Sequence, residues 1–298
     1  MNAMIYKNKR PLLLFLLPAF LFMAVFLYYP FAMNVINSFQ QISQLGAAAQ
    51  GVNTPWYENY RLLFTDPLMA TTMKNTLLMI VFTIVFQVGI ALLLALMVDN
   101  IKKGAGFFRT AYFFPIVISA TALGLMFNLI FMYDGGMVNQ LLQHVGLLAP
   151  NAAVDWKDES HALVTMFIPV CWQYVGFYFV ILLTGLNTIS PDVYEAAKID
   201  GATRLQCVRY ITLPLLHNTL CVCLTLAITG ALKVFDLPWV MFPSGMPMDK
   251  TWMTGTYMYY QAWKLGNVDY SAAIAVVIVC LGVVLSRLAN RVFREKEY

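Results

Sequence analysis

The sequence predicts an all-α, polytopic membrane protein with six transmembrane helices. Of its 298 residues, 60% are hydrophobic and 11% are charged, and the mean hydropathy is +0.68. Soluble domains average about 45–50% apolar and about 25% charged residues. The charges also gather in short stretches, which leaves apolar runs of about the 20 residues that a helix needs to cross the hydrocarbon layer. We therefore expect a single membrane domain over residues 1–298.

Six apolar runs are long enough to be transmembrane helices. They are expected over residues 11–29, 75–98, 110–132, 162–186, 213–235 and 272–288. Pro30 ends the first run, Asp99 follows the second, and Arg109 precedes the third. The first run follows basic residues, as the core of a secretory signal peptide does. Such a core is usually about 7–15 residues long with small residues close behind, whereas this longer run leads into Tyr-Tyr-Pro, so we expect a retained span.

Lysine and arginine predict the orientation, because positive residues near the spans favour the cytoplasmic side. Thirteen of them fall on one side and six on the other. The first group is Lys7, Lys9, Arg10, Lys102, Lys103, Arg109, Lys198, Arg204, Arg209, Arg287, Arg291, Arg294 and Lys296; the second is Arg61, Lys74, Lys157, Lys233, Lys250 and Lys264. We expect both termini and the loop 190–212 in the cytoplasm. The net charge of +4 thus indicates topology, and no nucleic-acid partner is expected.

Motifs for catalysis, cofactors and metals are missing from the sequence. It has no Gly-x-x-x-x-Gly-Lys-Ser/Thr phosphate loop, no His-Glu-x-x-His zinc motif and no Gly-x-Ser-x-Gly elbow. The five cysteines form no Cys-x-x-Cys pair, and buried small side chains are their expected role. We expect no enzyme activity, no cofactor and no metal in this chain.

Intramembrane charge is almost absent, although ion-coupled transporters need ionisable residues at depth. Within the six predicted spans only Lys233, near the end of the fifth, qualifies as such a residue. It either pairs with Asp236 at i,i+3 spacing or extends its amine to the interface. A secondary transporter is therefore the weaker alternative, and energy for uphill transport is expected to come from a partner.

The polar loop between the fourth and fifth spans is expected to hold a short helix. Ser190 is a good N-cap and Pro191 suits the first helical position. Gly201 can adopt the left-handed conformation that ends a helix. Ala196 and Ala197 leave a smooth surface against which a partner protein could pack closely.

Residues 195–214 read Glu-Ala-Ala-x-x-Asp-Gly-Ala-x(8)-Ile-x-Leu-Pro, and this string resembles the signature of the permease subunits of binding-protein-dependent ABC importers. Val208 departs from it, since an aromatic residue is usual there. The resemblance implies a type I importer permease fold and a coupling helix that fits a groove on a cytoplasmic ATPase. Two copies of that ATPase would bind ATP and Mg. The implied coupling residues are Glu195, Ala196, Ala197, Asp200, Gly201 and Pro214, of which Glu195 and Asp200 would anchor or cap the helix.

Several segments are similar to carbohydrate-uptake permeases of the maltose and glycerol-phosphate type, and the N-terminal pattern resembles the first of their two permease subunits. These segments are 18–30, 38–39, 59–67, 75–76, 235–236, 257–259 and 269–273. This implies a second, homologous permease as heterodimer partner, an extracytoplasmic solute-binding protein, a sugar substrate and a bacterial cytoplasmic membrane. Residues 241–247 depart from the usual Thr-Gly-Gly-Gly-Pro. A polyamine or phosphate is the alternative solute.

The fourth span carries the best candidates for the solute path. Pro169 is expected to kink it, and aromatic and neutral polar side chains suited to a sugar follow at Trp172, Gln173, Tyr174 and Tyr178. The alternative for the aromatic residues is anchoring at the membrane interface. Asn128 and Gln87 are weaker candidates because amides also join helices, and Lys233 with Asp236 completes the set. Outer loops over 31–74, 133–161 and 236–270 are expected to receive the binding protein, and 56–64 to form an interfacial helix.

Overall fold

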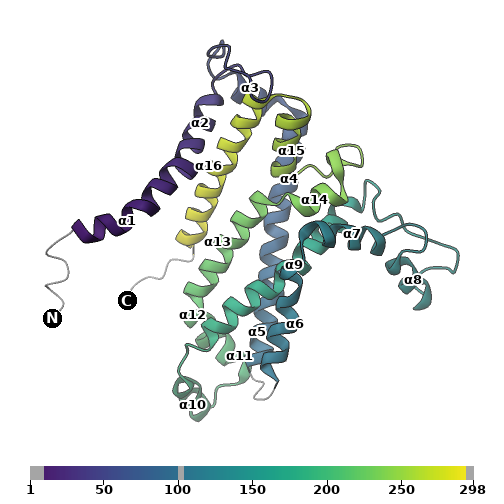
Figure 1. Ribbon diagram of the computed structural model, residues 1–298. Coiled ribbons are helices and arrows are strands. Elements are labelled where there is room, and N and C mark those ends of the chain that lie inside the picture. The colour runs from purple at the N-terminus through teal and green to yellow at the C-terminus, as the bar shows by residue number, and fades with distance from the viewer. Residues whose placement is uncertain (1–9, 100–103, 293–298) are drawn as a thin grey trace. The chain divides into compact units, whose positions relative to one another are not determined.

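The computed structural model describes residues 10–99 and 104–292, and within these ranges it is built from helices, with no β-strand (Figure 1). The chain divides into two compact units. The first comprises Met1–Thr65 and Met258–Val277, and the second Asp66–Tyr257 and Ile278–Tyr298.

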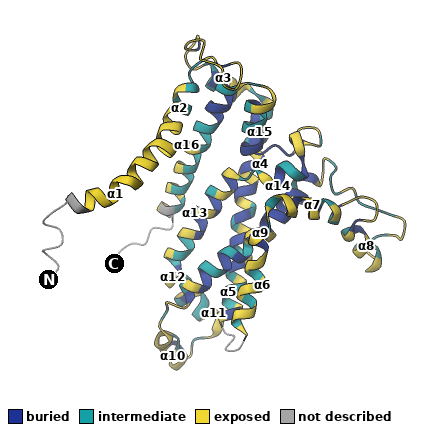
Figure 2. Ribbon diagram, in the orientation of Figure 1, coloured by how far each residue is buried: buried dark blue, intermediate teal, exposed yellow. Residues whose placement is uncertain are grey.

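The first unit begins with one continuous apolar helix, Leu12–Asn37. It lies within the continuous run of α1 (Arg10–Met23), the π-helical turn η1 (Ala24–Tyr28) and α2 (Tyr29–Asn37). The predicted end before Pro30 is wrong. The π-turn changes the hydrogen-bond register there, with the Tyr29 N–H donating to the Ala24 carbonyl, and Pro30 then falls in the first turn of α2, where a proline is tolerated. Residues 12–33 are exposed throughout (Figure 2), as expected of a surface in contact with lipid.

The rest of the first unit packs around the end of α2. The predicted interfacial helix over 56–64 is α3 (Glu58–Thr65). Ser38 is fully buried, with its hydroxyl 2.8 Å from that of Tyr60, and Asn59 donates to the Ser38 carbonyl at 3.1 Å. The end of α15 (Thr254–Tyr259), η5 (Tyr260–Lys264) and the first part of α16 (Val268–Val292) complete this unit.

The second unit starts with an apolar helix of 33 residues, Pro67–Asp99. It is composed of α4 (Pro67–Phe82), the π-helical segment η2 (Thr83–Val88) and α5 (Gly89–Asp99). Asp66 caps it by accepting from the Leu68 N–H at 2.8 Å, with Pro67 at the first helical position. The run predicted as the second span, 75–98, lies within this helix, which begins earlier.

The third predicted span, 110–132, is divided, so the prediction of one continuous helix is wrong. α6 (Ala105–Val117) and α7 (Ala120–Ile130) meet at a bend of 95°. Pro115 removes a backbone donor from the last turn of α6, Ile118 is extended, and Ser119 caps α7 by accepting from the Ala122 N–H at 3.2 Å. The described residues contain five helices long and apolar enough to cross a membrane, or six if α6 and α7 form one broken span.

The remaining spans of the second unit are α9 (Ala162–Leu186) and α13 (His217–Lys233), together with the later part of α16. α9 has the bounds that the sequence predicts, and Pro169 does not interrupt it. Shorter helices connect the spans: α8 (Met137–His144), α10 (Pro191–Ile199), α11 (Arg204–Cys207), η3 (Val208–Thr212), α12 (Leu213–Leu215), α14 (Asp236–Met241) and η4 (Pro243–Gly245).

α9 forms the centre of the second unit, and Figure 2 shows it largely buried. One apolar cluster on its first half includes Met79, Leu123 and Met166. Gly176 lets α6 approach closely, since a Cβ there would lie 1.8 Å from the Tyr112 carbonyl oxygen.

Candidate functional site

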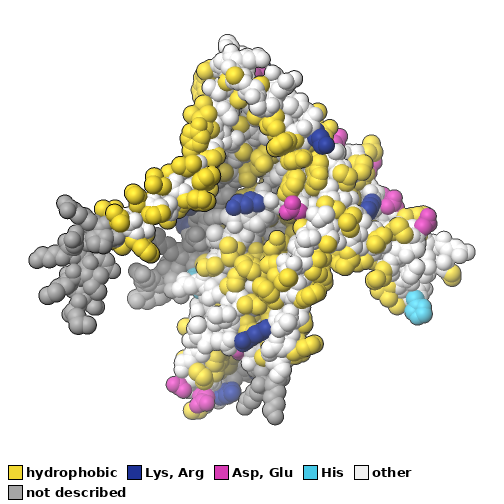
Figure 3. All heavy atoms as spheres, viewed as in Figure 1, with side chains coloured by type: hydrophobic (Ala, Val, Ile, Leu, Met, Phe, Trp, Pro, Cys, Tyr) yellow, Lys and Arg dark blue, Asp and Glu magenta, His cyan; other side chains and the backbone are white. Residues whose placement is uncertain are grey.

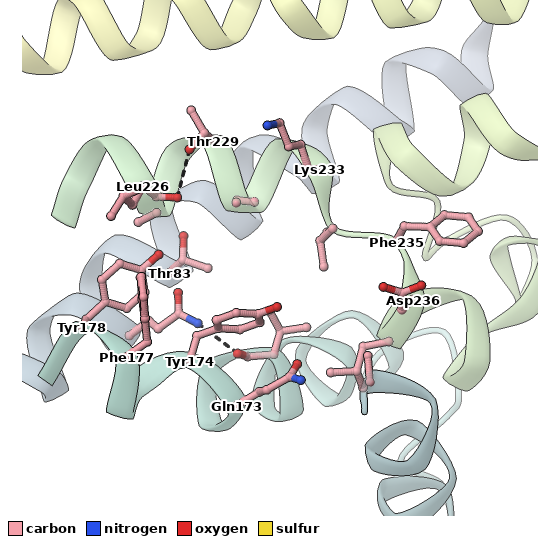
Figure 4. Close-up of a pocket in the computed structure, with 18 residues that line it drawn as sticks. Thr83, Gln173, Tyr174, Phe177, Tyr178, Leu226, Thr229, Lys233, Phe235 and Asp236 are labelled. Atoms are coloured by element: carbon pink, nitrogen blue, oxygen red, sulfur yellow. Dashed lines mark hydrogen bonds between the residues drawn. The ribbon is translucent and has the colours of Figure 1, made fainter. Parts of the chain in front are cut away.

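A cavity of about 350 Å³ lies in the second unit between α9 and α13 (Figure 4). The π-helical segment η2 contributes Thr83 and Gln87, and α7 contributes Ala120. The other lining residues are Val170, Gln173, Tyr174, Phe177 and Tyr178 of α9; Leu226, Ala227, Thr229, Gly230, Ala231 and Lys233 of α13; and Val234, Phe235, Asp236 and Leu237 beyond it. π-helical turns inside α-helices are frequent at functional sites.

Two breaks in helical backbone border this cavity. The first is the bend between α6 and α7, and the second lies at Val234 and Phe235, between α13 and α14. α7 and α14 pack tightly together, because a Cβ on Gly124 would lie 2.7 Å from Val240. Non-helical backbone at membrane depth is tolerated where it is buried in protein or lines a cavity, and broken helices commonly mark solute sites in transporters.

Gln173 connects α9 to the first break. Its side chain is 4% exposed, and its Nε2 donates to the Ile118 carbonyl at 3.3 Å. The bond gives a partner to a carbonyl at the bend, where regular helical bonding stops. Gln87 is similarly buried and donates to the Val170 carbonyl at 2.9 Å. Both amides therefore line the cavity while they fix its walls.

Two of the predicted aromatic residues line the cavity and one does not. Tyr174 and Tyr178 lie on the side of α9 that faces α13, Tyr174 exposed and Tyr178 buried (Figure 4). Trp172 lies outside the cavity lining, because two positions before Tyr174 it points to another face of α9. There it contacts Phe127 edge-on and lines a separate apolar hollow with Phe82 and Phe86.

Lys233 and Asp236 both line the cavity, but these two described residues form no ion pair. α13 ends at Lys233 and α14 begins at Asp236, so the i,i+3 geometry of a continuous helix does not apply. Figure 4 shows the Lys233 amine directed away from the Asp236 carboxylate. Of the two alternatives for Lys233, the ion pair with Asp236 is therefore not formed.

Asn128 also lies outside the cavity lining. Its Oδ1 accepts from the Lys157 amine at 2.6 Å, and its Nδ2 donates to the Val240 carbonyl of α14 at 3.4 Å. Burial lowers the pKa of Lys157, and the Asp155 carboxylate partly opposes that shift. Asn128 thus joins the loop before α9 to α7 and α14.

Thr83, Phe177, Thr229 and Phe235 line the cavity although sequence reasoning missed them. Two of them could have been found from helical spacing, which places residues three or four apart on one face. Thr83 lies four residues before Gln87, and Phe177 lies three residues after Tyr174. Thr229 and Phe235 had no such signal, because their place depends on how α13 packs and where it breaks.

The predicted polar loop contains the predicted short helix, α10. Ser190 caps it by accepting from the Asp192 N–H at 3.4 Å, and Pro191 is its first residue. Gly201 has a left-handed φ of +78°, the Ala202 N–H donates to the Ala197 carbonyl at 2.9 Å, and the Gly201 N–H to the Lys198 carbonyl at 3.1 Å. This pair of bonds is the Schellman ending of a helix.

The surface of α10 is mainly free. Glu195, Ala196, Asp200 and Gly201 are exposed, whereas Ala197 is buried. Ile199 and, in α11, Leu205 are apolar yet 86% and 77% exposed. An apolar surface presented on a polar loop is typical of a protein–protein contact.

The loop is also tied to the spans on both sides. The Tyr194 hydroxyl lies 3.1 Å from that of Thr212 in η3, and Thr203 with Gln206 forms a capping box at α11. A Cβ on Gly185, near the end of α9, would lie 2.7 Å from Leu216 and Thr219. Pro214 lies within α12, before α13, and is exposed.

The segment that follows α14 is compact. Gly245 has a φ of +73° and packs against the Trp252 ring, whose Nε1 donates to Asp249 at 2.7 Å. Asn75 of α4 donates to the carbonyls of Lys250 and Trp252 at 2.7 and 3.0 Å. Residues 241–253 are therefore held against α4.

Long apolar helices, a cavity at two helix breaks and an exposed capped helix define a multi-pass membrane protein with a solute-sized pocket. A family model described as "Binding-protein-dependent transport system inner membrane component" matches residues 88–296. The chain belongs to this family.

Relatives match along nearly the whole chain. It is 33% identical over 294 residues to the probable ABC transporter permease protein YurN of Bacillus subtilis, covering 98% of both chains. It is 28% identical to the lactose transport system permease protein LacF of Rhizobium radiobacter, covering 95% of this chain and 94% of LacF. The fold matches a crystal structure of a bacterial ABC transporter that imports alginate, with a TM-score of 0.82, 24% identity and 98% of both chains covered.

Proposed function

We propose that this chain is a transmembrane permease subunit of an ATP-driven importer, that it forms the translocation path for a sugar, and that the loop Glu195–Pro214 couples it to cytoplasmic ATPase subunits. The observation that carries the proposal is the place of α10 between the two helices that line the cavity. Four residues separate the end of α9 from the start of α10, and the chain continues through α11, η3 and α12 into α13. A displacement of α10 would therefore reach both walls of the cavity.

The chemistry of the cavity supports a sugar as the solute. Tyr174, Phe177, Tyr178 and Phe235 bring aromatic rings, which suit the apolar faces of sugar rings. Lys233 and Asp236 offer a donor and an acceptor for hydroxyl groups. With one lysine and one aspartate among its lining residues, the cavity has no formal net charge, which favours a polyhydroxylated solute over a polyamine or phosphate.

The relatives support the same class of solute. LacF is named for lactose transport, AraP of Bacillus subtilis for arabinooligosaccharides, and SmoG of Agrobacterium fabrum for sulfoquinovosyl glycerol. All three match at least 95% of this chain.

The partners follow from the same proposal. The exposed face of α10 fits a groove on one of two identical ATPase subunits, which bind ATP and Mg; this chain has no phosphate loop of its own. A second, homologous permease completes the path, and a solute-binding protein delivers the sugar on the other side. The excess of basic residues beside α10 supports a bacterial cytoplasmic membrane with both termini in the cytoplasm.

Co-purification tests the proposal. The chain is expressed with its companion permease, ATPase and binding protein, and isolated through a tag on this chain. We expect the ATPase to co-purify and to show vanadate-sensitive hydrolysis that the sugar-loaded binding protein stimulates. Isolation as an active, ATP-independent carrier would overturn the importer assignment. Stimulation only by a polyamine or phosphate would overturn the sugar assignment and leave the ATP-driven mechanism standing.

A further inference from the structure

The eight-residue helix α8 (Met137–His144) has one apolar and one polar side. At 100° per residue, Met137, Leu141 and Val145 fall within one narrow arc, and these three are 64%, 60% and 57% exposed. Asn139, Gln140 and Gln143 occupy the other side, and His144 lies at the edge of the apolar arc. The apolar arc thus lacks cover from the described part of this chain.

Hydrogen bonds on the polar side fix the rotation of α8 about its axis. The Asn139 side chain is 2% exposed, and its Nδ2 donates to the carbonyls of Met132, Tyr133 and Val154 at 3.4, 3.1 and 3.0 Å. Its Oδ1 accepts from the Val154 N–H and the Trp156 Nε1 at 3.2 and 3.0 Å. Gln143 donates to the Ala152 carbonyl at 2.8 Å. With two side chains bonded into the loop 150–156, the apolar arc must face outward.

α7, which precedes α8 by the short connection 131–136, also carries exposed apolar residues. Leu125, Leu129 and Met132 are 57%, 66% and 45% exposed, while Leu123 and Phe127, on the other side of α7, are buried in the core. After α8, Leu147 is 73% exposed. Figure 1 shows α8 beyond α7, to the side of α6 and α9 that faces away from the core of the second unit, and Figure 3 shows apolar side chains over this region together with acidic side chains and a histidine.

We propose that α8 is an interfacial helix that lies on the lipid bilayer, with Met137, Leu141 and Val145 immersed at the boundary between head groups and acyl chains. The occupant of the surface is lipid, because α7 belongs to a helix pair apolar enough to cross a membrane, and its exposed apolar residues lie only a short connection before α8. Amphipathic helices bind at this depth through their apolar side. α8 contains no Lys, Arg, Asp or Glu, so its attachment depends on apolar burial and not on anionic lipid.

In this arrangement the loop 133–161 attaches the second unit to the bilayer surface, in addition to any part it has in transport. Asn139 and Trp156 connect α8 to the segment that holds Lys157, and Lys157 bonds to Asn128 of α7. A lipid-anchored α8 would hold that segment at a fixed depth beside the α7–α14 contact.

Photocrosslinking in the intact transporter tests the proposal. p-Benzoylphenylalanine is introduced at position 141 or, as a second site on the same arc, at position 145, and the complex is reconstituted in bilayers of phosphatidylcholine alone or with phosphatidylglycerol. Position 140 is the matched control, because Gln140 is an exposed neighbour on the polar side. Mass spectrometry identifies the adducts.

We expect phospholipid adducts at positions 141 and 145 in several-fold higher yield than at position 140, equally in both lipid mixtures and unchanged by high salt. Equal lipid yields at positions 140 and 141 would overturn the proposal. So would crosslinks from position 141 mainly to the solute-binding protein or to the companion permease. A lipid adduct that requires phosphatidylglycerol would overturn the claim that apolar burial alone attaches α8.

Discussion

Gly201→Val is expected to weaken the link between ATP hydrolysis and solute uptake. Gly201 has a φ of +78°, and a Cβ at this residue would meet no atom within 4 Å. The change therefore adds backbone strain without a clash. An L-residue in the left-handed conformation costs about 1–2 kcal/mol, with β-branched residues at the upper end, and this would lower the population of the formed α10 ending roughly tenfold.

Gly46→Val is the matched control, because Gly46 has a φ of +81° and likewise has no neighbour within 4 Å, yet lies in a loop of the first unit. Gly201→Asn, which tolerates a positive φ, should restore much of the coupling. The assay is the ratio of solute taken up to ATP hydrolysed in proteoliposomes. We expect that ratio to fall for Gly201→Val, with normal membrane insertion, and to remain near wild type for Gly46→Val. The same ratio in both variants would refute the role assigned to the ending of α10.

Three further predictions concern helix packing and the loop 133–161. Gly176→Ala would force a Cβ to 1.8 Å from the Tyr112 carbonyl oxygen, which should lower the free energy of unfolding by about 1–3 kcal/mol or more and lower the thermal midpoint. Gly230→Ala is the control, because a Cβ there has no neighbour within 4 Å, and its thermal midpoint should not fall. Asn139→Ala should lower the free energy of unfolding by about 1–3 kcal/mol, because it leaves buried polar groups without partners, and should speed proteolysis within 133–161. Gln140→Ala should change the proteolysis rate little. Equal proteolysis rates in the two variants would count against the Asn139 contacts. The backbone N–H of His161 is the main cause that lowers the pKa of Asp158 below its ordinary 3.8, so the stabilisation it gives is present above pH 3.8 and lost as pH falls through the lowered value. Hydrogen exchange at the His161 amide should speed up, relative to its intrinsic rate, over that range, and Asp158→Asn should abolish this pH dependence.

Much of the fold could be predicted because its causes are local. The bounds of α9 follow from an uninterrupted apolar run between polar residues. α10 could be predicted from Ser190, Pro191 and Gly201, since a cap, a first-turn proline and a left-handed glycine act within one turn of the chain. Glu195 to Pro214 could be related to a transporter family for the same reason, because the signature is contiguous.

The features that sequence reasoning missed depend on contacts between distant segments. The 95° bend between α6 and α7 lies within one apolar run, and only Pro115 and Ser119 hint at it. Its second support, Gln173, lies 55 residues from Ile118. Asn128 is a neutral polar residue of the kind expected along a solute path, but its Oδ1 accepts a hydrogen bond from Lys157, 29 residues away.

Reconstituted uptake tests the central claim most directly. Proteoliposomes are prepared with this chain, its companion permease and the ATPase, loaded with ATP and Mg, and supplied outside with binding protein and a labelled sugar to which that protein binds. Accumulation of the sugar against its gradient is predicted, dependent on both ATP and binding protein and lost with a hydrolysis-deficient ATPase. Uptake that proceeds without ATP, or that follows an imposed ion gradient, would contradict the account.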